Sequence, residues 1–106
     1  MRRIVKLHDE KFDKDYFLEW STIVDGFVTY GMPIEQFREY YQYTYGVTGL
    51  KSFEEVLLPR VELNGNSSLM YKNNDWIEQF NHCGEDDKQL TMEEILENYC
   101  RNIPKE

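Results

Sequence analysis

Apolar and polar residues alternate along the first part of the chain in the manner of β-strands. Two runs rich in β-branched and aromatic residues, 2–8 and 16–24, flank a polar stretch from Asp9 to Asp15. In the second run one face carries Tyr16, Leu18, Trp20, Thr22 and Val24, and the other carries Phe17, Glu19, Ser21 and Ile23. Asp25-Gly26 follows and favours a tight hairpin turn, because both turn residues need positive φ. With residues 27–32 as the return strand, we predict a three-stranded antiparallel meander over residues 2–32.

The pattern then changes to a helical one. Pro33 suits the first position of a helix, where its missing N–H costs nothing. Apolar side chains then recur every three or four residues, at Ile34, Phe37, Tyr40, Tyr41 and Tyr45. Gly46 is a natural stop. We expect this helix to lie across one face of the meander.

The middle of the chain favours a short helix followed by a second hairpin. Residues 52–55 have the form of a capping box and open a helical stretch that we expect Pro59 to end. Arg60 to Asn64 then reads as a strand, and Asn64-Gly65 as a tight turn. Leu69 to Lys72 would be the return strand.

Two further helices are predicted in the last third. Asn73 or Asn74 caps one that runs through Trp76, Ile77 and Phe80 toward Gly84. Thr91 and Glu94 form a capping box for the other, with Leu90 and Ile95 at the two staple positions. Its buried face comprises Met92, Ile95, Leu96, Tyr99, Cys100 and Ile103. The expected fold is therefore a single α+β domain over residues 1–106, a small antiparallel sheet packed with three to four short helices.

Composition supports a folded, acidic chain. Apolar residues make up 41% of the 106 residues and the formal net charge is −8. About seven of those negative charges fall in residues 54–106. This balance disfavours nucleic acid and anionic membrane surfaces as partners, since both are negatively charged. Neither a secretory leader nor a membrane span is apparent, so we expect a cytoplasmic protein in which Cys83 and Cys100 stay reduced.

No residue pattern indicates a metal site, a cofactor or catalysis. Cys83 and Cys100 are too far apart in sequence for a paired zinc motif, and His8 is remote from His82. Ser21, Asp25 and His82 are residue types that could form a nucleophilic triad. No nucleophile-elbow motif surrounds the serine, so the sequence does not indicate one. The expectation is a non-enzymatic protein without a metal or a cofactor.

The segment from Trp20 to Met32 is the candidate binding site. It combines large rings with hydroxyl groups and a carboxylate, which is typical of a small-ligand site. An ordinary core hairpin with an exposed threonine explains the same pattern, so both interpretations stay open. The candidate ligand-binding residues are Trp20, Ser21, Thr22, Asp25, Thr29, Tyr30 and, as a phosphate-binding arginine, Arg60.

Several stretches resemble a family of small bacteriophage proteins without assigned activity. The resemblance runs through Leu18 to Met32 and the Gln36-Phe37-Arg38-Glu39-Tyr40-Tyr41 segment. It returns in Leu58 to Glu62, in Leu90 to Ile95 and in Tyr99 to Arg101. Those relatives often have proline where Phe27 stands. The resemblance implies phage origin and action in the host cytoplasm, where small accessory proteins commonly counter host defences. It implies nothing about chemistry.

Three binding roles follow from this context. The first is capture of a small nucleotide-like signal by an oligomer, since the chain has more aromatic side chains than one small core obviously needs. The second is inhibition of a basic host protein by the acidic half, including Glu85, Asp86 and Asp87. Imitation of DNA ranks third, because many of the carboxylates alternate with apolar positions.

Overall fold

The computed structural model describes residues 2–82 and 88–102, and it confirms the α+β fold. Three antiparallel strands pair in the order β1-β2-β3. They are β1 (Arg2–Asp9), β2 (Lys14–Ser21) and β3 (Gly26–Phe27). The helical elements are α1 (Ile34–Ser52), the π-helical turn η1 (Phe53–Leu57), α2 (Leu58–Asn64), α3 (Asp75–Phe80), α4 (Met92–Leu96) and the π-helical turn η3 (Glu97–Arg101).

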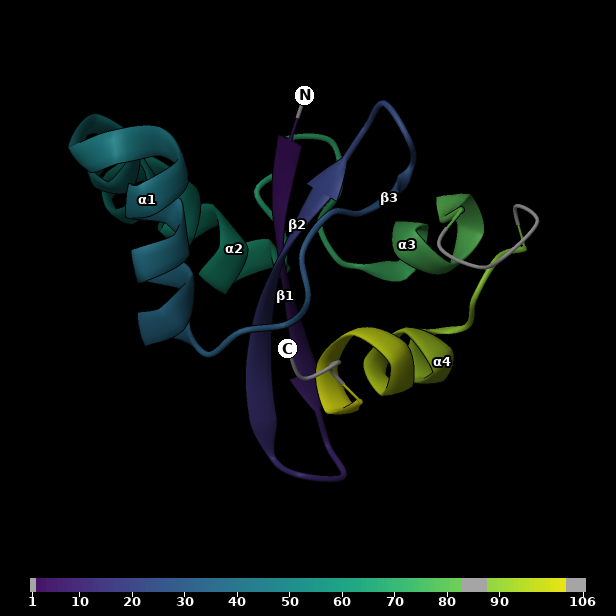
Figure 1. Ribbon diagram of the computed structural model, residues 1–106. Helices are drawn as coiled ribbons and strands as arrows, with labels where there is room; N and C mark the ends of the chain where they lie inside the picture. The colour runs from purple at the N-terminus through teal and green to yellow at the C-terminus, as the bar shows by residue number, and fades with distance from the viewer. Residues whose placement is uncertain (1, 83–87, 103–106) are drawn as a thin grey trace.

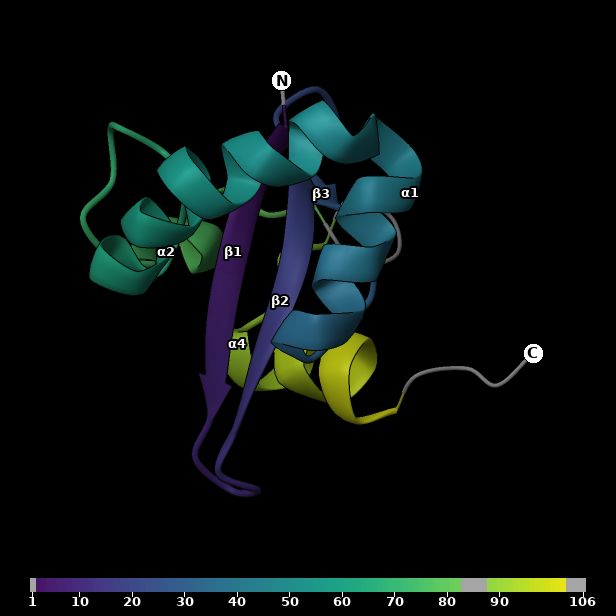
Figure 2. The same cartoon turned by 90° about the vertical axis from the view of Figure 1, so that its left-hand side faces the viewer.

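Helices cover both faces of the sheet. In Figure 1, α1 and α2 lie on one side of β1 and β2, and α3 and α4 lie on the other. Figure 2 shows α1 and α2 across the near face of the two long strands. Two separate apolar cores result. The first contains Val5, Leu7, Leu18, Trp20, Phe27, Trp76, Ile77, Leu90, Ile95, Leu96 and Cys100, and the second contains Ile4, Phe17, Met32, Phe37, Phe53 and Val61.

The predicted alternation along β2 is correct as far as the strand extends. Leu18 and Trp20 face the core under α3 and α4, whereas Phe17 packs in the core under α1. The register of β1 against β2 matches these faces, since Val5 pairs with Leu18 and Arg3 pairs with Trp20. Directly opposed residues lie on the same face of a sheet. Position 3 therefore shares its face with Trp20.

The turn between β2 and β3 differs from the predicted one. β2 ends at Ser21, and a four-residue turn over 22–25 precedes Gly26, which pairs with Ser21 instead of occupying the turn. The Ser21 hydroxyl accepts a hydrogen bond from the Ile23 N–H at 3.2 Å, which closes the strand early. The third strand is correspondingly short. Pairing resumes only at Met32, which exchanges two backbone hydrogen bonds with Phe17.

The second hairpin is wrong, because the chain stays helical from α1 through η1 to α2. Ser52 has helical backbone angles and makes no cap, and Pro59 lies in the first turn of α2, where its missing N–H is tolerated. Phe53 and Val61 are fully buried against the sheet, and this burial outweighs the local strand signals of Arg60 to Asn64. Leu69 to Lys72 is likewise not a strand.

The Asn64-Gly65 pair predicted a hairpin turn, but it ends a helix instead. The φ of Gly65, 81°, is left-handed, as a hairpin turn would require, but here the glycine terminates α2, and its N–H donates to the Val61 carbonyl. The next residues then run beside the outer edge of β1. The Gly65 carbonyl accepts from the Lys6 N–H at 2.8 Å, and the Ser67 N–H donates to the Ile4 carbonyl at 2.9 Å.

The remaining helices agree with the prediction in most respects. The Thr91–Glu94 capping box is confirmed, with both reciprocal hydrogen bonds present. These bonds lower the pKa of Glu94. α3 ends at Phe80, where Asn81 caps it. Gly84 and Ile103, which the prediction also used, lie outside the described residues. Across the described ranges, no helix combines the length and the apolarity needed to cross a bilayer.

Two carboxylates are buried, one on each face of the sheet. Glu19 faces α1 and accepts hydrogen bonds from Tyr45 at 2.9 Å, from Tyr40 at 3.1 Å and from Arg2 at 3.0 Å. Burial and the Glu19 carboxylate raise the pKa of both tyrosines. On the opposite face, Asp9 accepts two 2.8 Å hydrogen bonds from Arg101.

Gly46 interrupts α1 with φ 79° and ψ −178°, a region open essentially to glycine alone. A Cβ there would meet no atom within 4 Å, so the cost of a side chain is backbone strain. We expect Gly46→Ala to lower the free energy of unfolding by about 1–3 kcal/mol in urea titration. Thr48→Ala, at an exposed helical position nearby, should change it little. Equal stability of the two variants would contradict this account.

Asp9 makes folding depend on pH. Its hydrogen bonds with Arg101 hold the pKa of Asp9 at about 2, below its ordinary 3.8. A lowered carboxyl pKa stabilises the fold above the unfolded-state pKa, and that stability is lost as pH falls through the folded-state pKa. Asp9→Asn should therefore be less stable than the natural chain at pH 5–7. The difference in unfolding free energy should shrink between about pH 4 and pH 2. Glu10→Gln serves as the control, and a pH-independent gap for Asp9→Asn would refute the linkage.

Candidate functional site

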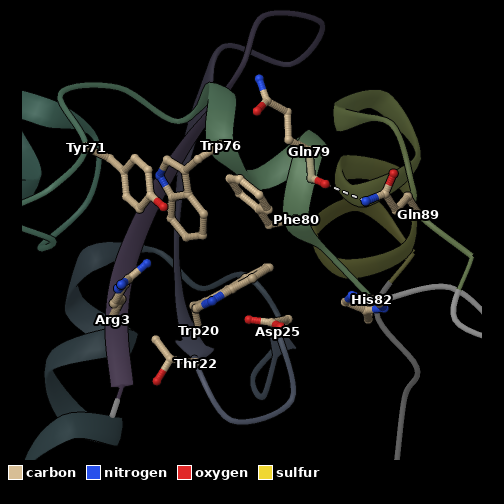
Figure 3. Close-up of a pocket in the computed structure, with 10 residues that line it drawn as sticks. All are labelled: Arg3, Trp20, Thr22, Asp25, Tyr71, Trp76, Gln79, Phe80, His82 and Gln89. Atoms are coloured by element: carbon tan, nitrogen blue, oxygen red, sulfur yellow. Dashed lines mark hydrogen bonds between the residues drawn. The ribbon is translucent and has the colours of Figure 1, made fainter.

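Three of the seven candidate binding residues line one hollow. It has a volume of about 340 Å³ and opens between the Arg3 end of β1 and β2, the turn over 22–25, and α3. Its lining residues, drawn in Figure 3, are Arg3, Trp20, Thr22, Asp25, Tyr71, Trp76, Gln79, Phe80, His82 and Gln89. The hollow is therefore lined both by the predicted Trp20–Asp25 segment and by residues between Tyr71 and Gln89.

The other four candidates lie elsewhere. The Ser21 hydroxyl is buried and bonded to the Ile23 N–H, and the Thr29 hydroxyl accepts from the Glu19 N–H at 3.0 Å. Tyr30 is exposed and its ring packs 5.9 Å from that of Tyr99. Arg60 belongs to α2, the helix on the opposite face of the sheet. The structure does not bring Arg60 to Trp20.

Aromatic rings form the inner wall of the hollow. Trp20 and Trp76 meet edge to face with centroids 4.9 Å apart, and Tyr71 stacks on Trp76 at 5.1 Å. Both tryptophans are almost fully buried, whereas Phe80 is about half exposed at the rim. Edge-to-face and stacked contacts hold such rings in fixed orientations. The two buried tryptophans thus form a fixed base for the hollow, and the more exposed rings of Tyr71 and Phe80 are the ones against which another flat ring can pack.

Arg3 supplies the positive charge that the prediction assigned to Arg60. Its guanidinium carbon lies 5.4 Å from the centroids of both Tyr71 and Trp76. Among the described residues, it has no carboxylate within ion-pair distance, and its guanidinium instead lies over the two ring faces. The alternation of side chains along β1 could have predicted the placement of Arg3, because position 3 shares a face with Val5 and Leu7.

Polar groups surround the aromatic wall. Asp25 has a left-handed φ of 51°, and its carbonyl accepts from the His82 N–H at 2.7 Å, which joins the turn to the end of α3. The Gln89 amide donates to the Gln79 carbonyl. The indole N–H of Trp76 is buried and has no hydrogen-bond partner within the described parts of the chain. Such a group is costly unless a bound molecule or water satisfies it.

A second hollow, of about 570 Å³, lies at the other end of the sheet beside the β1–β2 turn. Lys11, Lys14, Tyr16 and Cys100 contribute to its lining. Arg101 lines it too, but its charge is already matched by Asp9, Glu93 and Glu97. Burial raises the pKa of Cys100 to about 12, so the thiol stays protonated and is a poor nucleophile. This hollow therefore offers fewer groups than the first for the specific binding of a ligand.

The geometry gives little support to metal or nucleophilic chemistry. Residues 2–82 and 88–102 contain no group of three or more histidine, cysteine, aspartate or glutamate side chains that could hold a metal ion. Asp25 and His82 line the first hollow, but Ser21 does not. Cys83 lies outside the described residues.

Comparison of the chain with family models, curated proteins and solved structures found no match.

Proposed function

We propose that this chain is a non-catalytic binding protein of phage accessory type that captures one small nucleotide-like molecule in the hollow between Arg3 and Asp25. The observation that supports the proposal is an aromatic wall with Arg3 beside it, an arginine that has no ion-pair partner among residues 2–82 and 88–102. Sequestration of a signal in the host cytoplasm is the role in which such capture counters a host defence.

The size and chemistry of the hollow suit one base with its attached group. A volume of about 340 Å³ lies near the lower end of small-ligand sites, which span roughly 300–1,000 Å³. Stacking of a base on an aromatic side chain contributes about 1–3 kcal/mol. Arg3 can donate two parallel hydrogen bonds to a phosphate group, and this local charge offsets the repulsion from a chain of net charge −8.

Inhibition of a basic host protein is the second candidate, and the concentration of negative charge after residue 53 favours it. Asp75, Glu78 and Glu93 are exposed on α3 and α4, while Glu85, Asp86 and Asp87 lie outside the described residues. Binding of this kind weakens steeply as salt concentration rises. Capture of an uncharged nucleoside by stacking in the hollow is far less sensitive to salt, which separates the two candidates.

Both tryptophans of the chain belong to the hollow, so intrinsic fluorescence reports directly on its occupancy. We expect a panel of nucleosides and their 5′-monophosphates to change this fluorescence, with calorimetry giving the affinity. Arg3→Gln should weaken the binding of monophosphates by about 10–100-fold, because a charged hydrogen bond contributes roughly 1.5–3 kcal/mol. It should affect the uncharged nucleosides much less.

Arg60→Gln is the matched control, since it removes the same charge from the other face of the sheet. It should leave every affinity within about twofold. A loss of phosphate binding in Arg60→Gln but not in Arg3→Gln would assign the phosphate to α2 and refute the hollow. Silence across the whole panel, with circular dichroism of a folded protein, would remove the nucleotide proposal.

A further inference from the structure

The hollow contains two opposite charges that do not neutralise each other. Arg3 enters from β1 and Asp25 enters from the turn after β2, and in Figure 3 Trp20 stands between them. Neither side chain has an ion-pair partner within 4.0 Å among the described residues. A molecule in the hollow therefore meets a hydrogen-bond donor at one end and an acceptor at the other.

A donor lies on one side. The guanidinium of Arg3 has only donors, and it lies over the Tyr71 and Trp76 rings. The opposite side offers the carboxylate of Asp25, which accepts hydrogen bonds at two oxygens. A flat ligand that satisfies both sides carries acceptors or a phosphate toward Arg3 and a pair of N–H donors toward Asp25.

We propose that the hollow selects a guanine-type nucleotide, with Asp25 as the residue that determines the base. Guanine presents N1–H and the 2-amino group side by side, and these two donors match the two oxygens of one carboxylate. Adenine and cytosine each present only one amino group on their pairing edge, beside a ring acceptor that faces the carboxylate unfavourably. This inference rests on the function proposed above and adds the identity of the base.

The backbone holds Asp25 in place for this role. The Asp25 carbonyl is tied to the His82 N–H, and the preceding turn is fixed by the hydrogen bond between Ser21 and Ile23. The left-handed φ of 51° is one that aspartate and asparagine tolerate better than most residues. Asp25→Asn therefore changes the hydrogen-bonding pattern of the side chain while preserving its shape and backbone conformation.

The test compares GMP, IMP, XMP and AMP by tryptophan fluorescence and calorimetry, with the natural chain and with Asp25→Asn. The natural chain should bind GMP about tenfold or more tightly than IMP, which lacks the 2-amino group. Asp25→Asn should lose that preference. It should bind XMP more tightly than the natural chain does, because the asparagine amide donates to the 2-oxo group while its oxygen accepts from N1–H.

Asp13→Asn is the matched control. Asp13 has the same φ of 51°, and its side chain is 95% exposed in the turn between β1 and β2. This variant should reproduce the natural order of affinities. Equal binding of all four nucleotides by both the natural chain and Asp25→Asn would overturn the base assignment while leaving nucleotide capture intact. No binding of any nucleotide, with the protein folded, would overturn both proposals.

Discussion

A sheet of three strands is buried on both faces, and this constraint governs the rest of the molecule. Strands that face water on one side can place polar residues there at no cost, but here a polar side chain in the covered part of a long strand needs hydrogen-bond partners. Glu19 and Asp9 are buried carboxylates of this kind. Each carboxylate is satisfied by partners from distant elements, which fixes α1 to one face and η3 to the other.

The same constraint places the hollow. The helices on the Trp20 face are short, since α3 has six residues and α4 has five. They cover the centre of that face but leave the Arg3 end to be closed by side chains alone. Trp76 closes it from α3, and Asn81 joins α3 to α4 through paired hydrogen bonds with Leu90. The aromatic wall is therefore rigid although the elements that carry it are small.

The parts that the sequence predicted correctly are those in which local and tertiary preferences agree. The alternation of β2, the stripe of α1 and the Thr91 capping box all depend on neighbouring residues, and all are present. The failure at Arg60 to Asn64 has a different origin. A left-handed glycine ends a helix as readily as it turns a hairpin, and only the burial of Phe53 and Val61 decides between them.

The candidate site was partly predictable for the same reason. Trp20, Thr22 and Asp25 belong to one continuous segment, so their proximity follows from the chain itself. Trp76 and Phe80 reach the hollow from α3 and Tyr71 from the segment before it, and no local pattern specifies that these residues pack beside Trp20. Arg60 was chosen as the arginine beside a strand and a turn, and that strand does not exist. Arg3 takes its place through the register of β1 with Trp20.

The backbone of residues 65–67, which lies along the outer edge of β1, has a consequence for self-association. An uncovered strand edge is a template on which a second chain can add a strand, and this is a common route to aggregation. Here the Lys6 N–H and the Ile4 carbonyl already have partners, and the opposite margin of the sheet is formed by the two-residue β3. Extension of the sheet from one molecule to the next is therefore blocked along the Ile4–Lys6 part of this edge.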